Sequence, residues 1–443
     1  MTKFVFHYNP KKLPPYSEKC HPVQMYDKYK WNPLASSCIA RPLIEKIRDL
    51  GCRVSNDSFD FLTIAMAVTA ADTFSRREDS KNTWSRELEL EIALYSPSNW
   101  TLVSKKLEKA LGYLTGDMWT LKFVNGGLAS PVPKRSKKAM SKRKSLKGLN
   151  CICLFSGGLD SAVGAIDIVN GEKGKPLLVS HAYKGDASKQ NEVEKVLHEG
   201  WYSRLSCNAD PHIINFLDGK TDITMRGRSF NFLAMAVLGL SAIQKVNQEK
   251  FEKIFIPENG YISLNPPLTR RRIGALSTRT THPYFLTQIQ GILFDVGINV
   301  ELINPYQIKS KGEMLKECTD QKALKKALPS TVSCSNWHRK GIQCGRCVPC
   351  IIRRAAVSFS GFSLDAPYDS INLKTVLSAG DAKDDLLALV AANQKLSKLK
   401  DVSRWVRESG PLPDQEDERR ELIGVFSRGL VEVGMFLKKE KVL

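Results

Sequence analysis

The segment from Cys151 to Ile166 constrains the fold of this chain more than any other stretch. It begins with an apolar run, continues into the string S-G-G-x-D-S at Ser156 to Ser161, and ends in a second apolar run. That order predicts a buried strand, a tight loop and the first turns of a helix. Two adjacent glycines let the backbone adopt positive φ and turn its N–H groups inward, which favours an anion. The segment therefore predicts a phosphate-binding loop at the end of a strand.

The residue types in this loop suit the phosphates of a nucleotide. The helix N-terminus carries partial positive charge, and the hydroxyls of Ser156 and Ser161 can donate hydrogen bonds to phosphate oxygens. Asp160 can hold a Mg²⁺ ion that neutralises them. An ordinary strand-to-helix turn also uses paired glycines, but the flanking strand and helix favour a binding site. The lysine and the spacing of a Walker A loop are missing.

Four of the eleven cysteines are grouped within one short segment. They are Cys334, Cys344, Cys347 and Cys350. Two successive C-x-x-C steps with a fourth thiol on a short loop predict a closed tetrahedral Zn²⁺ site. Four thiolates leave no open coordination position, so a structural role is expected. An iron–sulfur cluster uses the same ligands, and His338 inside the loop is a rival ligand.

The S-G-G-x-D-S loop resembles that of the PP-loop ATP pyrophosphatases, and the cysteine cluster behind it narrows the resemblance to the QueC family of 7-cyano-7-deazaguanine (preQ0) synthases. Between the two signatures, residues 226–236 are similar to an arginine-containing helix of that family, with Arg228 at the arginine and Ser229 where asparagine is usual. Residues 304–313 resemble the segment before the family's cysteine loop. The resemblance covers about residues 150–360.

This resemblance implies an enzyme that uses ATP and Mg²⁺ to transfer AMP to a substrate carboxylate. The implied ATP-binding residues are Ser156, Gly157, Gly158, Leu159, Asp160 and Ser161. The catalytic residues are then expected to be Asp160, Ser161 and Arg228, and Arg228 would help to stabilise negative charge during AMP transfer. Stabilising the departing pyrophosphate is the main catalytic task, and pre-aimed N–H donors with a metal ion suit it.

The stretch after the apolar run 253–257 departs from the family pattern. QueC proteins hold the deazaguanine there with a segment that ends in D-C-R, and this tripeptide is missing. Glu258 and Asn259 can still meet a guanine-like edge, whereas Arg279 and His282 can face a carboxylate, an adenylate or a nucleic acid. These four residues are the candidate substrate ligands. A long polar surface loop is the alternative interpretation.

Strands and helices alternate from residue 150 onward, which predicts a parallel sheet with helices on both faces. Ligands bind beyond the carboxyl ends of such strands. Tyr183, at the end of the predicted strand 176–183, is therefore a candidate for nucleotide binding.

The rest of the chain is expected to form three further regions. They are an α+β accessory domain at 1–130, a basic linker at 131–149 and a helical region at 363–443, which flank the catalytic domain at 150–362. Within the accessory domain, 84–94 and 119–124 are predicted strands, 102–114 is a predicted helix, and 59–71 is predicted to begin as a strand and enter a helix.

The chain carries a formal net charge of +20, and residues 134–147 hold eight Lys or Arg and no acid. The composition favours a solvated linker, and a contact with nucleic acid or with an acidic partner is the alternative. No aromatic residue is interleaved, which argues against a stacking surface for single strands within the run. No apolar run of eighteen residues and no signal-peptide pattern occur, so a cytoplasmic protein without membrane attachment is expected.

Chains with these additions resemble the extended QueC homologues of bacterial anti-phage operons, such as the Qat system. That resemblance implies adenylation of 7-carboxy-7-deazaguanine, or a similar acid, followed by transfer to an amine of a partner protein from the same operon. Two alternatives stay open. One is preQ0 synthesis for queuosine, and the other is a nucleic-acid-binding subunit of a defence complex, suggested by the charge of +20.

Overall fold

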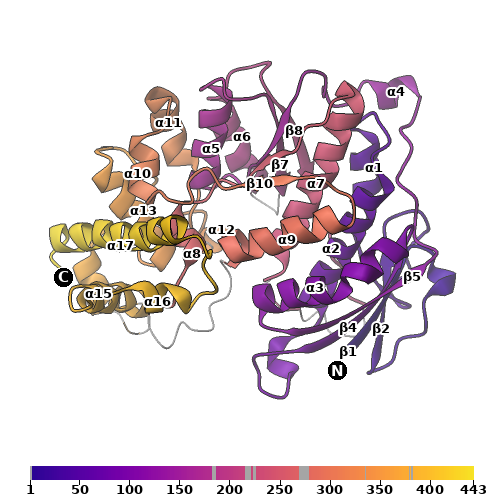
Figure 1. Ribbon diagram of the computed structural model, residues 1–443, viewed down its shortest axis with the longest axis horizontal. Helices are drawn as coiled ribbons and strands as arrows, with labels where there is room; N and C mark the ends of the chain where they lie inside the picture. Colours follow the sequence, from indigo (N-terminus) through magenta and orange to yellow (C-terminus); the bar gives the residue numbers. More distant parts are fainter. Residues whose placement is uncertain are drawn as a thin grey trace.

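The computed structural model describes residues 2–181, 186–214, 221–222, 226–268, 279–334, 336–378, 380 and 383–443. Two five-stranded parallel sheets dominate these residues (Figure 1). The first consists of β1 (Thr2–His7), β2 (Cys20–Met25), β3 (Ser37–Ile39), β4 (Glu87–Leu94) and β5 (Met118–Asn125). The second consists of β6 (Cys151–Leu154), β7 (Pro176–His181), β8 (Ser203–Cys207), β9 (Lys253–Phe255) and β10 (Glu301–Ile303).

Both sheets have the same topology. The strand orders are β3-β2-β1-β4-β5 and β8-β7-β6-β9-β10, so each sheet reverses its order between its first and fourth strands. In parallel sheets of this kind, ligands bind beyond the carboxyl ends of the strands at that reversal. The fold therefore offers two such positions, one at β1 and β4 and one at β6 and β9.

The N-terminal region is α/β and not α+β as predicted, because all four strand pairs of its sheet are parallel. Residues 84–94 contain a strand as expected, but the segment 59–71 is entirely helical and belongs to α2 (Asn56–Phe74). Every residue of α2 from Ser58 to Phe74 is buried. A helix buried on all sides shows no polar face, and its apolar run therefore looks like the start of a strand.

The two sheets share one hydrophobic core. Helices α2 and α7 (Arg228–Asn247) pack against each other between them, and Phe61 meets Phe230 edge-on at 5.3 Å (Figure 1). One cluster of buried apolar side chains continues from the first sheet through these helices into the second. Residues 229–247 are long and apolar enough to cross a membrane, but 67% of that window is buried inside the molecule, as in a core helix.

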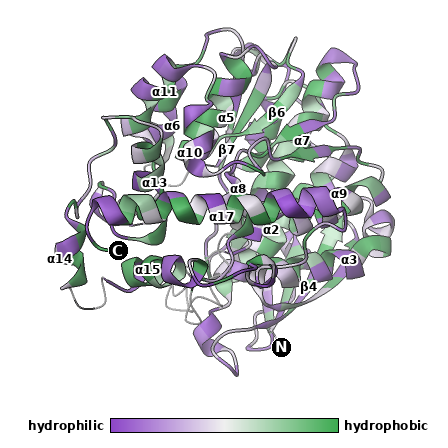
Figure 2. Ribbon diagram, turned by 60° about the vertical axis from the view of Figure 1, so that its left-hand side comes forward, coloured by the Kyte–Doolittle hydropathy of each residue, from purple (hydrophilic) through white to green (hydrophobic). Residues whose placement is uncertain are grey.

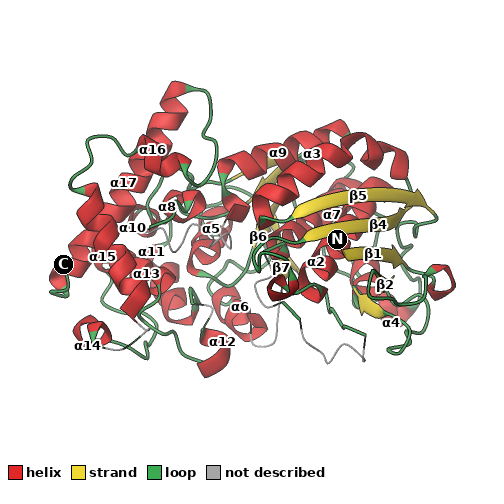
Figure 3. Ribbon diagram, turned by 90° about the horizontal axis from the view of Figure 1, so that it is seen from below, coloured by secondary structure: helices red, strands yellow, loops and turns green. Residues whose placement is uncertain are grey.

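Among the further helices, α1 (Leu43–Arg48), α3 (Pro97–Thr115), α5 (Leu159–Val169) and α9 (Pro283–Asp295) pack against strands of the two sheets. The others before the C-terminal region are α4 (Lys137–Met140), α6 (Asp186–Glu194), α8 (Gly260–Leu264), α10 (Lys311–Lys316), α11 (Gln321–Ala327) and α12 (Trp337–Lys340), with 3-10 turns at Pro10–Lys12, Arg77–Asp79, Arg279–Thr281 and Leu328–Ser330. Helices α3 and α9 lie side by side (Figure 3).

The C-terminal region is helical, as predicted. It follows α13 (Val348–Phe359) and comprises α14 (Leu373–Leu377), α15 (Asp384–Leu396), α16 (Ser403–Arg407) and α17 (Glu416–Lys439). Hydrophobic and hydrophilic residues alternate along α17 (Figure 2). Its apolar side packs with α8, α13 and α15 into a separate core that includes Tyr261, Trp405 and Phe426. The tail is thus fastened to the second sheet through α8 and α13.

Candidate functional site

The S-G-G-x-D-S loop lies between the end of β6 and the start of α5, at the reversal of the second sheet. Gly157 has a φ of +82°, and Gly158 is the N-cap of α5 without a capping side chain. The hydroxyl of Ser161 donates to the carbonyl of Gly158 at 2.9 Å, and that of Ser156 donates to Ser161 at 3.1 Å. The first N–H groups of α5 have no side-chain cap, as at helix N-termini that bind anions.

Two other segments hold this loop in place. The side-chain amide of Gln190 donates to the carbonyl of Ser156 at 3.2 Å, and the N–H of Val332 donates to the carbonyl of Gly157 at 3.2 Å. A Cβ atom at Gly157 would lie 3.0 Å from Cγ of Gln190. Because Val332 precedes Cys334 by two residues, the loop is joined directly to the segment that enters the cysteine cluster.

The sequence predicts that this loop binds ATP. On that prediction, replacing Gly157 by alanine is expected to weaken ATP binding by at least about tenfold, because the new methyl group strains the positive φ and presses on Gln190. Gly148→Ala is the matched control. Gly148 has a φ of +78°, and a Cβ atom there meets nothing within 4 Å. Isothermal titration of each variant with ATP measures the difference, and equal losses in both variants would show that backbone strain alone is responsible.

Asp160, in the first turn of α5, is buried and receives donors from two other segments. Its Oδ2 accepts from the backbone N–H of Asn259 at 3.0 Å and from its side-chain amide at 2.6 Å. Its Oδ1 accepts from Nζ of Lys311. Glu258 shares a hydrogen bond with the same carboxylate. The structure therefore places two of the predicted substrate ligands, Glu258 and Asn259, beside the predicted catalytic residue.

The two neighbouring carboxyl groups ionise differently. Burial alone would raise the pKa of Asp160, but the charge of Lys311 and the hydrogen bonds from its neighbours lower it below its usual value. Burial, and then the Asp160 charge, raise the pKa of Glu258 well above its usual range. Of the two carboxyl groups, Asp160 therefore ionises more readily and Glu258 holds its proton more readily.

Lys311 also belongs to this cluster, although it is not one of the candidate site residues predicted from the sequence. It is the first residue of α10 and lies 151 positions from Asp160 in the sequence. Its place in the 304–313 segment was the signal that pointed to it. Both oxygens of Asp160 have partners in this structure. The ammonium of Lys311 therefore lies beside Asp160, where the sequence predicts a Mg²⁺ ion. We therefore assign no step to a metal ion at Asp160.

Glu432 of α17 fixes the start of the helix that bears Lys311. Its carboxylate accepts from the hydroxyl of Ser310 at 2.7 Å and from the N–H of Gly312 at 3.0 and 3.1 Å. Ser310 and Glu313 form a capping box in the same turn. A Cβ atom at Gly312 would lie 2.5 Å from Oε2 of Glu432, so the contact requires glycine. The C-terminal region thus supports a residue of the candidate site.

This contact predicts a pH effect on stability. Burial raises the pKa of Glu432 to about 7. The negative charge of Glu313 raises this pKa further, and the positive charge of Lys311 lowers it. A carboxyl with a raised folded-state pKa stabilises the fold while protonated, so its contribution is complete below pH 4.5 and is lost as the pH rises through 7.

We expect Glu432→Gln, which keeps an acceptor oxygen, to raise the free energy of unfolding above pH 7 by at most about 3 kcal/mol and to change it little below pH 4.5. Urea unfolding at both pH values measures this. Glu432→Ala removes the acceptor and is expected to destabilise the protein at both. A Gln variant with the pH dependence of the wild type would contradict the assignment.

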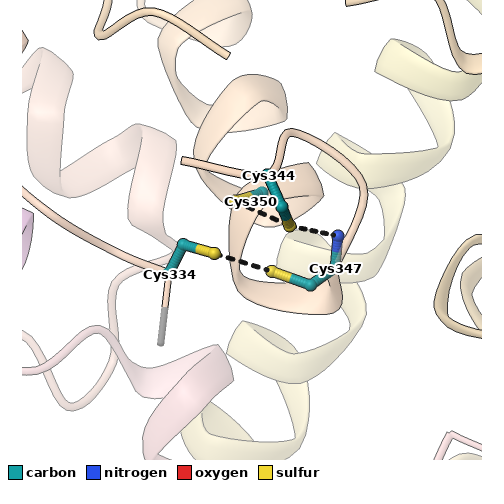
Figure 4. Close-up of side chains that lie close together, drawn as sticks. All are labelled: Cys334, Cys344, Cys347 and Cys350. Carbon is teal, nitrogen blue, oxygen red and sulfur yellow. Dashed lines mark hydrogen bonds between the residues drawn. The ribbon is translucent and has the colours of Figure 1, made fainter. Parts of the chain in front are cut away.

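The four cysteines converge, as the sequence predicted (Figure 4). All four sulfur atoms lie within 4.8 Å of one another, with 3.8 Å between Cys344 and Cys350 and 3.7 Å between Cys334 and Cys347. Tetrahedral zinc with Zn–S bonds of about 2.3 Å requires sulfur–sulfur distances of about 3.8 Å. The backbone N–H of Cys347 also donates to the sulfur of Cys344 at 3.3 Å. The cluster therefore fits a metal such as zinc in a closed, structural site.

Two arginines that follow the cluster bind carbonyl groups around it. Arg353, fully buried, donates to the carbonyls of Leu328 and Thr331 at 2.7 and 2.9 Å and forms an ion pair with Asp365. Arg354 donates to the carbonyl of Gly345, inside the cysteine loop, at 3.1 Å. Both side chains thus fasten the loop to its surroundings and support the ligand geometry.

Arg279 and His282 contact the first sheet's helices and the C-terminal region. Arg279 donates to the carbonyl of Tyr113 at 2.9 Å and lies 4.8 Å from the centre of its ring. His282 is fully buried as the N-cap of α9, where it accepts from the N–H of Tyr284 and faces the hydroxyl of Ser409 at 3.4 Å. Burial lowers the pKa of His282 to about 3, so it is neutral. Packing accounts for both residues, and their role as substrate ligands stays a prediction.

Three further candidates cannot be placed in the site. Tyr183 lies outside the described residues, and so do the side chains of Arg228 and His338. The backbone before Arg228 is held from the first sheet's side, because the N–H of Gly227 donates to Asp72 of α2 at 2.7 Å.

The fold and site define a class, an α/β protein with two five-stranded parallel sheets and a four-cysteine cluster. Comparison of the chain with protein-family models, with curated proteins and with solved structures finds no match. Its function is therefore inferred from the site and from the sequence motifs.

Proposed function

We propose that this protein is an ATP-dependent enzyme that activates a carboxylate as its acyl adenylate. The observation that supports this most is the position of the S-G-G-x-D-S loop. The loop lies where the strand order of the second sheet reverses. It has a positive φ at Gly157, and the helix that follows it has no side-chain cap. Its residue Asp160 contacts Lys311.

In the proposed reaction, a substrate carboxylate oxygen attacks the α-phosphorus of ATP. A new P–O bond forms, and the bond to the β-phosphate breaks to release pyrophosphate. The N–H groups of α5 and the ammonium of Lys311 stabilise the negative charge that accumulates on the phosphates. Ionised Asp160 positions Lys311 for this task. An amine then attacks the acyl carbon, and AMP leaves.

The finer part of the proposal is the substrate. The resemblance to the QueC family suggests a 7-deazaguanine carboxylate, and the predicted substrate ligands Glu258 and Asn259 lie next to Asp160, to which the Asn259 amide donates. We propose an amine of a partner protein as the acceptor, in anti-phage defence, because the N-terminal sheet and the C-terminal helices add surface that ammonia does not need.

Carboxylate-dependent exchange of labelled pyrophosphate into ATP tests the activation step. With 7-carboxy-7-deazaguanine we expect exchange, AMP as the nucleotide product, and a hydroxamate when hydroxylamine is added. Production of ADP, or turnover independent of the acid, would contradict adenylation. Mass spectrometry separates the acceptors: a mass-shifted partner supports conjugation, and free preQ0 formed with ammonia supports the synthase alternative.

A further inference from the structure

The first sheet offers a ligand position that the proposed function does not use. Its strand order reverses between β1 and β4, and on the β1 side of that position the segments that leave the carboxyl ends of β1 and β2 carry an unusual composition. The loop after β2 contains Lys28, Tyr29, Lys30 and Trp31 in succession, and the turn after β1 contains Lys11 and Lys12. Cationic and aromatic residues thus alternate at one edge of the sheet.

The aromatic rings of these segments are stacked. His7 and Tyr8 lie 4.9 Å apart between ring centres with an interplanar angle of 29°, and Tyr8 and Tyr29 lie 6.1 Å apart at 16°. Nζ of Lys28 lies 4.7 Å from the centre of the Tyr8 ring. Tyr29, at the outer end of this stack, is 42% exposed. The stack therefore ends in an open ring flanked by cations.

Trp31 extends this surface toward the second sheet. Its indole N–H donates to the carbonyl of Ser36 at 2.8 Å, which fixes the ring, and the Arg41 guanidinium lies 5.2 Å from its centre. Arg41 is itself held by Asp210 at 2.9 Å. The segment around Asp210 leaves β8 and pairs with β3, where Cys38 and His212 exchange two backbone hydrogen bonds of 2.8 Å.

The charge of this surface is positive. Among the described residues it contains Lys11, Lys12, Lys28, Lys30 and Arg41 against the carboxylates of Asp27 and Asp210. The four lysines are exposed. Arg41 forms an ion pair with Asp210. The basic run 134–147 differs, because no aromatic residue lies within it.

We propose that this aromatic–basic surface, formed by Tyr8, Lys11, Lys12, Lys28, Tyr29, Lys30, Trp31 and Arg41, binds single-stranded nucleic acid. Unpaired bases stack on Tyr29 and Trp31, and the lysines contact the phosphates between them. Base pairs in a duplex are already stacked and do not offer their faces to these rings. The surface therefore distinguishes single strands from duplexes by stacking, whereas the 134–147 run can contribute only charge.

Fluorescence anisotropy with labelled oligo-dT, oligo-rU and a duplex of equal length, about twenty nucleotides each, tests the proposal on the full chain. We expect tighter binding of a single strand than of the duplex. Tyr29→Ala/Trp31→Ala is expected to weaken single-strand binding at least about tenfold, whereas Tyr29→Phe/Trp31→Phe retains it. Lys28→Ala/Lys30→Ala should lower the salt dependence of log K by about 0.7 for each phosphate that the lysines no longer neutralise.

Lys137→Ala/Lys138→Ala/Lys142→Ala in the basic run is the matched control, and a thermal unfolding curve of each variant shows that the fold is kept. The dT and rU arms show which nucleic acid is preferred. The proposal is overturned if duplex and single strand bind equally, if no oligonucleotide binds at low salt, or if the control variant loses affinity and the ring variant does not.

Discussion

Asp160→Asn is expected to lower the rate of AMP formation on the order of 10³-fold, the largest effect on activity that the structure predicts. The asparagine keeps the size of the side chain but cannot balance the ammonium of Lys311. Both groups are buried, with side-chain exposures of 7% and 8%, so the lysine without its ionic partner is no longer held in place. The phosphates then lose a positioned positive charge. Quantification of AMP by chromatography, under saturating ATP and acid, measures the rate.

Asp167→Asn is the matched control for this experiment. Asp167 lies on the same helix and is also buried, but it accepts from the hydroxyl of Tyr306 at 2.6 Å and from Thr319 at 2.7 Å, away from the S-G-G-x-D-S loop. We expect this variant to lose stability and to keep its turnover at a temperature where it is folded. The double variant Asp160→Asn/Lys311→Met should regain stability without regaining activity. An Asp160→Asn enzyme with wild-type turnover would refute the proposed site.

The features of this site that could be predicted from sequence are local ones. The strand, the two glycines and the start of the helix follow each other within sixteen residues, and the cysteine ligands lie within seventeen. Short separations leave little freedom for other geometries, so the residue types and their spacing were sufficient.

The features that sequence could not supply depend on distant contacts. Lys311 reaches Asp160 across 151 positions, and Glu432 reaches Ser310 across 122, so neither pair leaves a periodic pattern. The parallel sheet of the N-terminal region joins β1 to β4 across about eighty residues, and β3 has only three residues. The sequence also gives no sign that Arg279 contacts Tyr113 and that His282 faces Ser409, because these partners lie more than a hundred residues away.

Cys350→Ala is expected to have the largest effect on stability. Cys350 is fully buried, and its sulfur lies 3.8 Å from that of Cys344, so its loss removes one of four converging thiolates. Structural zinc sites contribute about 10–16 kcal/mol of binding free energy in small zinc peptides, and loss of such a site exceeds the usual cost of a point mutation, about 0.5–3 kcal/mol. We expect the metal content to fall well below the wild-type value of about one ion per chain. We also expect a large decrease in melting temperature.

The matched control is Cys318→Ala, which removes a thiol that is 4% exposed and lies outside the cluster. It should keep the metal and cost about 1–2 kcal/mol. Elemental analysis by mass spectrometry distinguishes zinc from iron, and visible absorbance would reveal an iron–sulfur cluster. Because Val332 links the S-G-G-x-D-S loop to the segment entering the cluster, loss of the metal is also expected to weaken ATP binding. A Cys350→Ala protein with unchanged metal content and melting temperature would show that the four sulfurs converge without holding an ion.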